Sequence, residues 1–206
     1  MQKTKIIKVN PEKPDLKSIK EAAKIIKKGG LVAFPTETVY GLGAAYNNPD
    51  AVTKIYNVKK RSKNKPLTIH ISKMKTLESF DCEITHLAKT LMNKFWPGPL
   101  TIILNTKDNK KTIAFRMPEG EIAKCFIEAC GIPIVAPSAN ISGNKSPVSA
   151  EGVLKDLDGK IEAVIDGGTT DLGAESTIID VTSFPYRVIR EGVISKARIQ
   201  DAWHEV

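Results

Sequence analysis

Residues 31–43 of the chain read LVAFPTETVYGLG, and this stretch decides the fold. Its first four residues are all apolar, which is typical of a short buried strand. Pro35 ends that strand, and the polar residues 36–38 follow at once. Open α/β sheets place their binding sites at the ends of strands. The stretch therefore predicts an α/β fold with a site at this edge of the sheet.

Strands and helices alternate on either side of this stretch. Apolar residues recur at helical spacing before Gly29 and Gly30, and Asn48 with Pro49 is a typical helix start. We expect helices at residues 15–28, from 48 onward, and at 83–95, 121–129, 149–157 and 195–203. We expect strands at residues 5–9, 31–34, 67–71, 100–104, 112–116, 132–136, 163–165, 177–181 and 187–189. Because hairpin-like and crossover connections are mixed, the sheet is predicted to be mixed as well.

The composition favours one soluble domain. The chain has 206 residues, 41% of them hydrophobic, without repeats, linkers, signal peptide or membrane-length apolar run, so we expect a single cytoplasmic domain. Its three cysteines form no CxxC pair, which argues against a disulfide framework or a structural zinc site. The net charge of +8 comes mostly from lysine, which is usually solvated. There are only five arginines, and three of them fall in the motifs below.

Four segments place polar residues at the ends of predicted apolar strands. They are residues 35–43 (PTETVYGLG), 59–67 (KKRSKNKPL), 136–143 (APSANISG) and 173–180 (GAESTIID). Each alone is ordinary turn or surface chemistry, but together their charges and hydroxyls predict an anion pocket. The GLG at 41–43 and the GNKS at 143–146 complete neither a dinucleotide fingerprint nor a phosphate loop. An ATP site in this chain would therefore lack a standard loop.

In their order along the chain, these segments resemble the YrdC-like threonylcarbamoyl-AMP synthases. Further matches are WPGPLT at 96–101, RMP at 116–118 and IREG at 189–192, so the resemblance runs from about residue 6 to residue 192. Many members have proline where this chain has Ser62, and some have asparagine where it has Lys65, which concerns the stiffness of the loop. Some relatives carry an extra C-terminal domain, and this chain resembles the short form.

The resemblance implies a single YrdC-like domain over residues 1–206, with a twisted, mixed, open sheet, flanking helices and a basic concave cavity. It implies catalytic roles for Lys59, Arg61, Ser138 and Asn140. It implies L-threonine binding by Thr36, Thr38, His70, Arg116 and Ser176, with the choice between the two threonines open. It implies ATP binding by Lys59, Arg61, Lys65, Thr112, Ser138, Ser146 and Arg190. No residue is assigned to a metal, and Mg²⁺ is expected to arrive with ATP.

Two of these assignments have structural alternatives. A lone histidine on a strand, such as His70, is often a core residue without a ligand. Arg116 could form a salt bridge to Glu119 or Glu121, which are near in sequence.

The activity that the resemblance implies is that of an L-threonylcarbamoyladenylate synthase, a nucleotidyltransferase. Its substrates would be L-threonine, bicarbonate and ATP, and its product would begin the threonylcarbamoyladenosine modification of tRNA. A downstream threonylcarbamoyl transferase complex and tRNA are then the expected partners, and no membrane is expected. Two alternatives stay open: a non-catalytic protein that binds double-stranded RNA or tRNA, and a carbamoyl-transfer relative. The aromatic content of 6% speaks against a single-strand reader.

Overall fold

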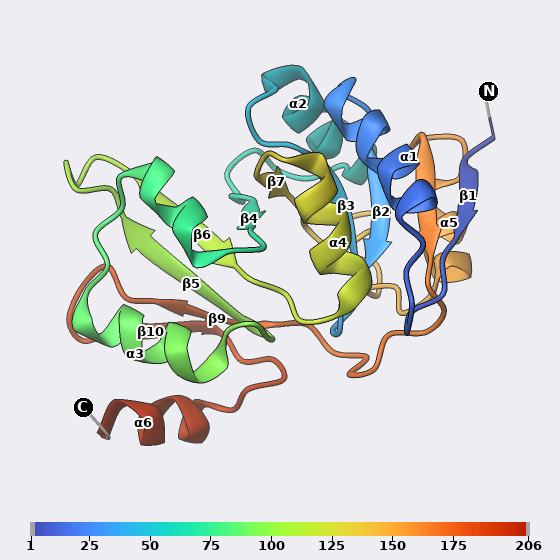
Figure 1. The fold of residues 1–206 in the computed structure, drawn as a ribbon. Helices are drawn as coiled ribbons and strands as arrows, with labels where there is room; N and C mark the ends of the chain where they lie inside the picture. Colours follow the sequence, from blue (N-terminus) through green and yellow to red (C-terminus); the bar gives the residue numbers. More distant parts are fainter. Residues whose placement is uncertain (1–2, 205–206) are drawn as a thin grey trace.

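The computed structural model describes residues 3–204, whose strands form one bent sheet with helices on both faces (Figure 1). The strands are β1 (Lys5–Lys8), β2 (Val32–Pro35), β3 (Tyr40–Ala45), β4 (Thr68–His70), β5 (Leu100–Asn105), β6 (Thr112–Arg116), β7 (Ile134–Val135), β8 (Ala163–Asp166), β9 (Thr177–Asp180) and β10 (Arg187–Arg190). Their order across the sheet is β1-β8-β2-β3-β7-β4-β6-β5-β9-β10. The sheet contains both parallel and antiparallel pairs, and it ends in two separate edge strands. The predicted mixed, open α/β sheet is confirmed.

The helices are α1 (Leu16–Lys27), α2 (Pro49–Lys59), α3 (His86–Phe95), α4 (Glu121–Cys130), α5 (Ala150–Leu157) and α6 (Lys196–His204), with a 3₁₀ helix η1 at Met74–Phe80. Helices α1, α2, α3 and α5 each begin directly after a residue whose side chain caps them. Asp15 accepts a hydrogen bond from Ser18 N at 2.8 Å, and Asn48 accepts one from Ala51 N at 3.1 Å. Such caps satisfy amide groups that have no partner inside the helix. All six predicted α-helices are confirmed.

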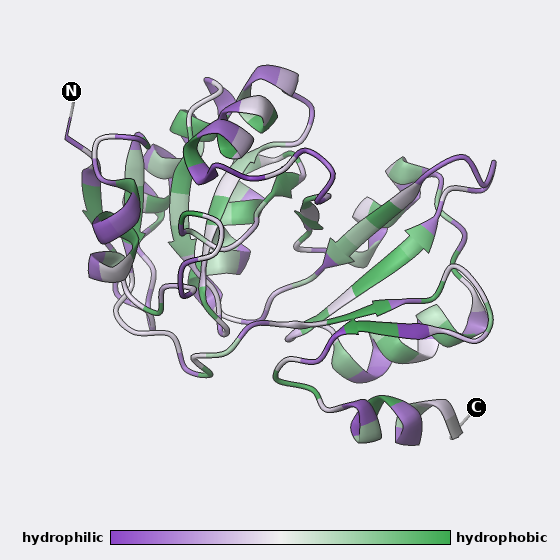
Figure 2. Cartoon of the chain, turned by 180° about the vertical axis from the view of Figure 1, so that it is seen from behind, coloured by the Kyte–Doolittle hydropathy of each residue, from purple (hydrophilic) through white to green (hydrophobic). Residues whose placement is uncertain are grey.

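Alternating residues of the buried strands feed two hydrophobic clusters, one on each face of the sheet. Val32 and Phe34 pack with α1 and α4, whereas Ala33 belongs to the cluster on the opposite face. This is the period-two pattern of a strand whose neighbours cover both sides. Figure 2 shows mainly hydrophobic strands beneath helices that carry both kinds of residue. The two ends of the sheet are called its wings: one contains β1, β8, β2 and β3, and the other contains β5, β9 and β10. The α3 and α6 helices cover the second wing (Figure 1).

Two elements were not predicted from the sequence. Strand β3 follows β2 through a four-residue turn and pairs with it as a hairpin, from Val32↔Gly43 to Pro35↔Tyr40. Its glycines lie against neighbours: a Cβ on Gly43 would come within 3.2 Å of Val32 O. Glycine is otherwise unfavourable in a strand, which hid this element. The other is η1. The helix expected over 83–95 begins later, at His86, because the Thr85 hydroxyl caps it at 3.2 Å.

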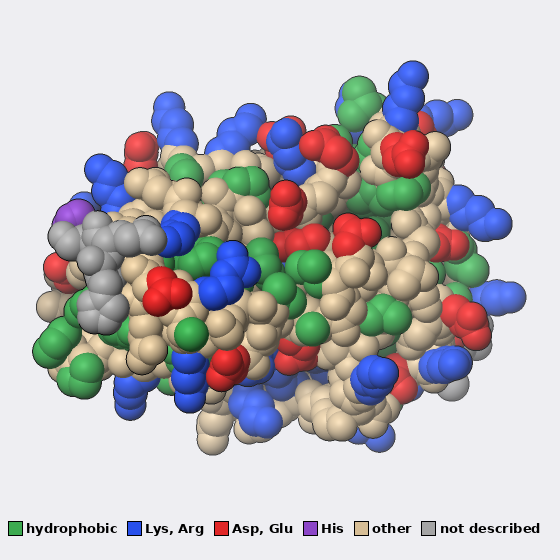
Figure 3. All heavy atoms as spheres, turned by 90° about the horizontal axis from the view of Figure 1, so that it is seen from below, with side chains coloured by type: hydrophobic (Ala, Val, Ile, Leu, Met, Phe, Trp, Pro, Cys, Tyr) green, Lys and Arg blue, Asp and Glu red, His purple; other side chains and the backbone are tan. Residues whose placement is uncertain are grey.

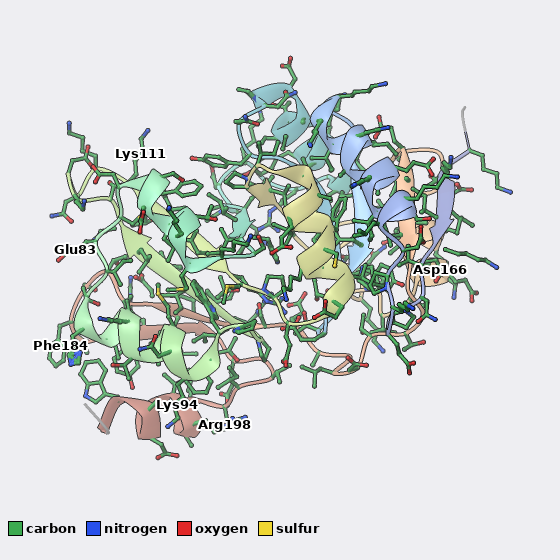
Figure 4. All side chains as sticks on the ribbon, viewed as in Figure 1. Glu83, Lys94, Lys111, Asp166, Phe184 and Arg198 are labelled. Carbon is green, nitrogen blue, oxygen red and sulfur yellow. The ribbon has the colours of Figure 1, made fainter. Side chains whose placement is uncertain are left out.

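The charged surface is dispersed on the face seen from below. Figure 3 shows Lys and Arg side chains scattered there, with Asp and Glu between them. Figure 4 shows Lys111 on the β5–β6 hairpin at the outer end of the wing. Within residues 3–204, no helix combines the length and apolar character needed to cross a bilayer.

Candidate functional site

One cavity of about 260 Å³ collects residues from all four motif segments. It lies where the strands of the two wings meet, and it is lined by the β2–β3 turn, the loop after α2, β4, β6, the loop after β7, and the first residues of β9. The sequence predicted that these segments form one anion pocket at the strand ends, and the structure brings them together. Five cationic side chains line it: Lys59, Arg61, Lys65, Arg116 and Arg190.

The β2–β3 turn presents one threonine to the cavity and buries the other. Thr36 lines the cavity, and its hydroxyl donates to Val39 O at 2.7 Å. Thr38 is fully buried; its hydroxyl lies 2.8 Å from that of Thr36, and its carbonyl accepts from the Thr170 hydroxyl. Thr38 therefore supports the turn, and of the two threonines Thr36 is the one placed to meet a ligand.

The 137–140 turn is fastened to β3. Leu42 N donates to Pro137 O at 2.7 Å, and Ala139 N donates to Tyr40 O at 2.8 Å. The Ser138 hydroxyl donates to Asn140 Oδ1 at 2.6 Å. Asn140 Nδ2 in turn donates to Asn144 O at 2.7 Å. Asn140 thus organises the loop that carries Ser138 into the cavity.

Lys59 is almost completely buried, with 1% of its surface exposed at the end of α2. Its ammonium donates to Ser138 O and, at 2.6 Å, to Asn140 O. Burial, followed by the nearby Arg61 charge, lowers the pKa of Lys59 from 10.5 to about 8. Since these acceptors belong to the 138–140 turn, Lys59 holds that turn as well as lining the cavity.

Arg61 braces the cationic loop that follows α2. Its Nε donates to Lys65 O at 3.1 Å, and its Nη2 donates to Pro66 O at 2.9 Å. Burial lowers the pKa of Arg61 from its ordinary value. Lys65 is exposed at the rim of the cavity.

Arg190 and Ser146 share the carboxylate of Glu175, a residue that was not predicted to belong to the site. Arg190 Nη1 donates to Glu175 Oε2, and the Ser146 hydroxyl donates to Glu175 Oε1 at 2.5 Å. Arg190 Nη2 also donates to Ser176 O at 2.8 Å and to the Ser176 hydroxyl at 3.2 Å. The Ser176 hydroxyl lies 3.0 Å from that of Thr101. Glu175 is therefore a counter-ion inside the cationic part of the cavity.

Arg116 ends β6 and is buried in the cavity wall. Its Nε donates to Gly98 O at 3.3 Å, and its Nη2 lies 2.8 Å from Glu37 Oε1. The alternative salt bridge to Glu119 or Glu121 is wrong: Glu37, distant in sequence, is the ion-pair partner, and Glu121 pairs with Lys124.

His70 lies beside Arg116, its register partner across β4 and β6, and lines the cavity. Burial, followed by the Arg116 charge, lowers the pKa of His70 from 6.5 to about 3, so the imidazole is neutral at ordinary pH. Its ring makes an edge-to-face contact with Phe34 at 6.3 Å. It is therefore both a packed residue and a polar wall of the cavity.

Thr112 is a predicted site residue that lies outside the cavity lining. It is exposed at the start of β6, four residues before Arg116, and does not line the cavity. Four residues of strand span roughly 13 Å. A nucleotide contact by Thr112 stays a prediction, and it requires a ligand that extends beyond the cavity.

The fold and the cavity together define an open α/β protein with a composite anion site. A cationic group (Lys59, Arg61, Lys65 and Arg190) lines the cavity together with the counter-ion Glu175, and a buried group (Thr36, His70, Thr101, Arg116 and Ser176) adds one guanidinium and several hydroxyls. The Sua5_yciO_yrdC family model, described as telomere recombination, matches residues 24–192. The chain belongs to this family.

Individual relatives agree with this assignment. The Bacillus subtilis (strain 168) threonylcarbamoyl-AMP synthase is 44% identical over 191 residues, 88% of this chain and 55% of the relative. The Pyrococcus abyssi (strain GE5 / Orsay) threonylcarbamoyl-AMP synthase is 46% identical over 196 residues, 91% of this chain and 58% of the relative. The crystal structure of P. abyssi Sua5 complexed with L-threonine has a TM-score of 0.92 and 45% identity, covering 98% of this chain and 62% of that chain. The chain thus spans between about half and three fifths of the length of these relatives.

Proposed function

We propose that this chain forms threonylcarbamoyl-AMP and pyrophosphate from L-threonine, bicarbonate and ATP. The observation that carries the proposal is one cavity that joins a cationic group suited to phosphates with a buried guanidinium suited to an amino-acid carboxylate. Relatives that are 44% and 46% identical are named threonylcarbamoyl-AMP synthases, and the similar P. abyssi structure is described as complexed with L-threonine.

The reaction consists of two bond-forming steps. The amine of L-threonine attacks bicarbonate, which gives an N-carboxylate and releases water. An oxygen of that carboxylate then attacks the α-phosphorus of ATP, and pyrophosphate leaves. Every reacting group except the amine is an anion, so neutralising charge and fixing position are the main tasks.

The described side chains divide these tasks. Arg61, Lys65 and Arg190 face the phosphates, and Lys59 fixes the turn that carries Ser138. The planar fork of Arg116 suits a bidentate contact to the threonine carboxylate. Ser176 links the two groups, because it accepts a hydrogen bond from Arg190 of the cationic group and lies within hydrogen-bond distance of Thr101 in its own buried group. The mechanism assigns no covalent intermediate to the enzyme.

Mg²⁺ would enter with the nucleotide as part of the substrate. No group of three or more His, Cys, Asp or Glu among residues 3–204 could hold a metal. Glu175 is the carboxylate in the cavity wall, and Mg²⁺ with nucleotide phosphates commonly takes only one or two protein carboxylates. The residues therefore fit an ion held mainly by the phosphates.

The product is a mixed anhydride, which must pass its threonylcarbamoyl group to an acceptor. We place a threonylcarbamoyl transferase complex and tRNA downstream of this chain as the consumers of that product. This assigns the chain to the first step of the tRNA modification.

Pyrophosphate release tests the proposed reaction. We expect release from ATP that depends on both L-threonine and bicarbonate, together with an adenylate detected by mass spectrometry. Equal release without L-threonine would refute it. A non-catalytic RNA-binding protein would release none, and a carbamoyl-transfer enzyme would require carbamoyl phosphate in place of bicarbonate.

A further inference from the structure

Glu37 and Arg116 form an ion pair buried inside the protein. Each side chain is 5% exposed, and Arg116 Nη2 lies 2.8 Å from Glu37 Oε1. Yet both carboxylate oxygens of Glu37, and Arg116 Nη2 itself, lack a hydrogen-bond partner with acceptable geometry. Buried charges are normally both paired and hydrogen-bonded. This pair has the charge compensation without the hydrogen bonds.

Glu37 does not pair bidentately with Arg116, because only Nη2 of the guanidinium lies within ion-pair distance of it. A carboxylate that paired bidentately with Arg116 would occupy the donors of the fork. Nη2, the nitrogen nearest Glu37, is almost inaccessible to solvent, and Nε donates to Gly98 O. Arg116 lines the cavity, while Glu37 does not. Glu37 therefore balances the charge of Arg116 through one nitrogen and from inside the cavity wall.

The net charge of this buried group follows from its members. Thr36, Thr101 and Ser176 contribute neutral hydroxyls. Burial and the Arg116 charge hold the pKa of His70 at about 3, so His70 is neutral as well. Arg116 is thus the one charged member of the buried group, and Glu37 cancels its charge. The neighbouring Arg190, which donates to the Ser176 hydroxyl, is paired with Glu175.

We propose that Glu37 is a specificity-determining residue that makes the Arg116 subsite select zwitterionic amino acids over carboxylates that lack the amine. This rests on the proposed function, which places the amino acid at Arg116. A carboxylate without an amine would leave a net negative charge beside Glu37 in a water-poor wall, where charges interact strongly. A zwitterion leaves the local sum at zero. The selection matters because the amine is the group that attacks bicarbonate.

Titration calorimetry with two ligands tests the proposal in the intact protein. The ligands are L-threonine and (R)-3-hydroxybutanoate, which has the same carboxylate and hydroxyl but no amine. We expect the wild-type protein to bind the analogue at least about tenfold more weakly, the factor typical of one charge-assisted contact. In Glu37→Gln, Arg116 loses its counter-ion, so the ratio should fall below about threefold, mainly through tighter binding of the analogue.

Two control variants separate selectivity from folding. Glu121→Gln removes an exposed glutamate that pairs with Lys124, and its ratio should match the wild type. Glu37→Asp keeps the charge on a shorter side chain, so it should bind threonine more weakly while keeping the preference for the zwitterion. Unchanged ATP affinity shows that each variant is folded.

Several results would overturn the proposal. Equal affinity of the wild-type protein for both ligands would do so without any variant, as would a folded Glu37→Gln that keeps the wild-type ratio. A wild-type protein that binds ATP but neither ligand would refute the amino-acid subsite of the proposed function, and this proposal with it. If Glu37→Gln does not fold, loss of the preference in Glu37→Asp decides against it.

Discussion

Replacing Lys59 with methionine tests whether one buried ammonium builds the nucleotide end of the cavity. The change keeps most of the length of the side chain but removes the donor to the carbonyls of Ser138 and Asn140. A buried acceptor that loses its donor costs about 1–3 kcal/mol, while removing a buried charge returns part of that loss. We expect the free energy of unfolding to fall by about 2 kcal/mol, which corresponds to a fall in Tm of about 4–8 °C for a chain of this size.

The same change should weaken nucleotide binding. The cavity loses one cation, and the turn that carries Ser138 loses its anchor. Charge-assisted hydrogen bonds are worth about 1.5–3 kcal/mol, so the Kd for ATP should rise by about one to two decades.

The lowered pKa of Lys59 adds a test by pH. The folded protein releases this proton near pH 8, whereas the unfolded chain releases it near 10.5. Between these values the unfolded chain binds more protons, so the contribution of Lys59 to stability rises with pH. Nucleotide affinity should fall over the same range, because the folded site loses its cation. Lys59→Met should lack both slopes.

Lys54→Met is a matched control on the same helix. Lys54 donates to Gly29 O at 2.9 Å, but it is exposed and does not line the cavity. Differential scanning calorimetry and ATP titration at pH 7, 8 and 9 compare the two variants. If Lys59→Met binds ATP as tightly as Lys54→Met, or keeps the wild-type pH dependence, the structural role assigned to Lys59 is refuted.

Three further changes distinguish cavity residues from their surroundings. Arg61→Ala removes two hydrogen bonds to the loop backbone, so calorimetry should show the affinity for ATP weakened by about one to two decades. The control Lys110→Ala, on the exposed hairpin, should change that affinity less than about twofold, and equal losses in the two variants would contradict the prediction. Arg116→Lys loses the planar fork, so L-threonine affinity should fall at least about tenfold with ATP affinity kept; unchanged threonine affinity would remove Arg116 from the site. Thr177→Val removes the hydroxyl that accepts hydrogen bonds from the backbone amides of Gly192 and Ile194. Urea unfolding should therefore show a free energy of unfolding lower by about 2–3 kcal/mol, and a decrease of less than about 0.5 kcal/mol would refute the prediction.

The sequence predicted most of the fold because local signals there agree with tertiary packing. Helix α1 has a capping aspartate, four apolar residues at helical spacing, and a glycine at φ 78° after its end. Strand β3 escaped prediction because Gly41 and Gly43 speak against a strand, and close packing on Phe34 explains them only once the fold is known. The strand order was not predictable, because nothing local specifies that β7 pairs between β3 and β4.

The candidate site was predictable as a set of residues but not as a network. Most predicted residues line the cavity, yet Glu37 and Glu175 received no role although both lie inside the motifs. An acidic residue in a turn that is otherwise buried signals a cationic partner. Glu37 meets that description, and its partner lies 79 residues further along the chain, at Arg116. Sequence proximity instead suggested Glu119 and Glu121, which shows why spacing alone is a poor guide to buried pairs.

Sheet register is what joins the two wings into one site. Parallel pairing of β4 with β6 sets His70 opposite Arg116, and a register shift in β10 between Val188 and Arg190 brings Arg190 opposite Ile178 in the cavity wall. Bulges of this kind re-aim side chains next to functional sites. A slip of one residue would turn these side chains to the other face of the sheet. The packing of the apolar faces fixes the strand register, and it therefore also fixes the distance between the amino-acid end and the nucleotide end of the cavity. A reaction between two bound substrates depends on that distance.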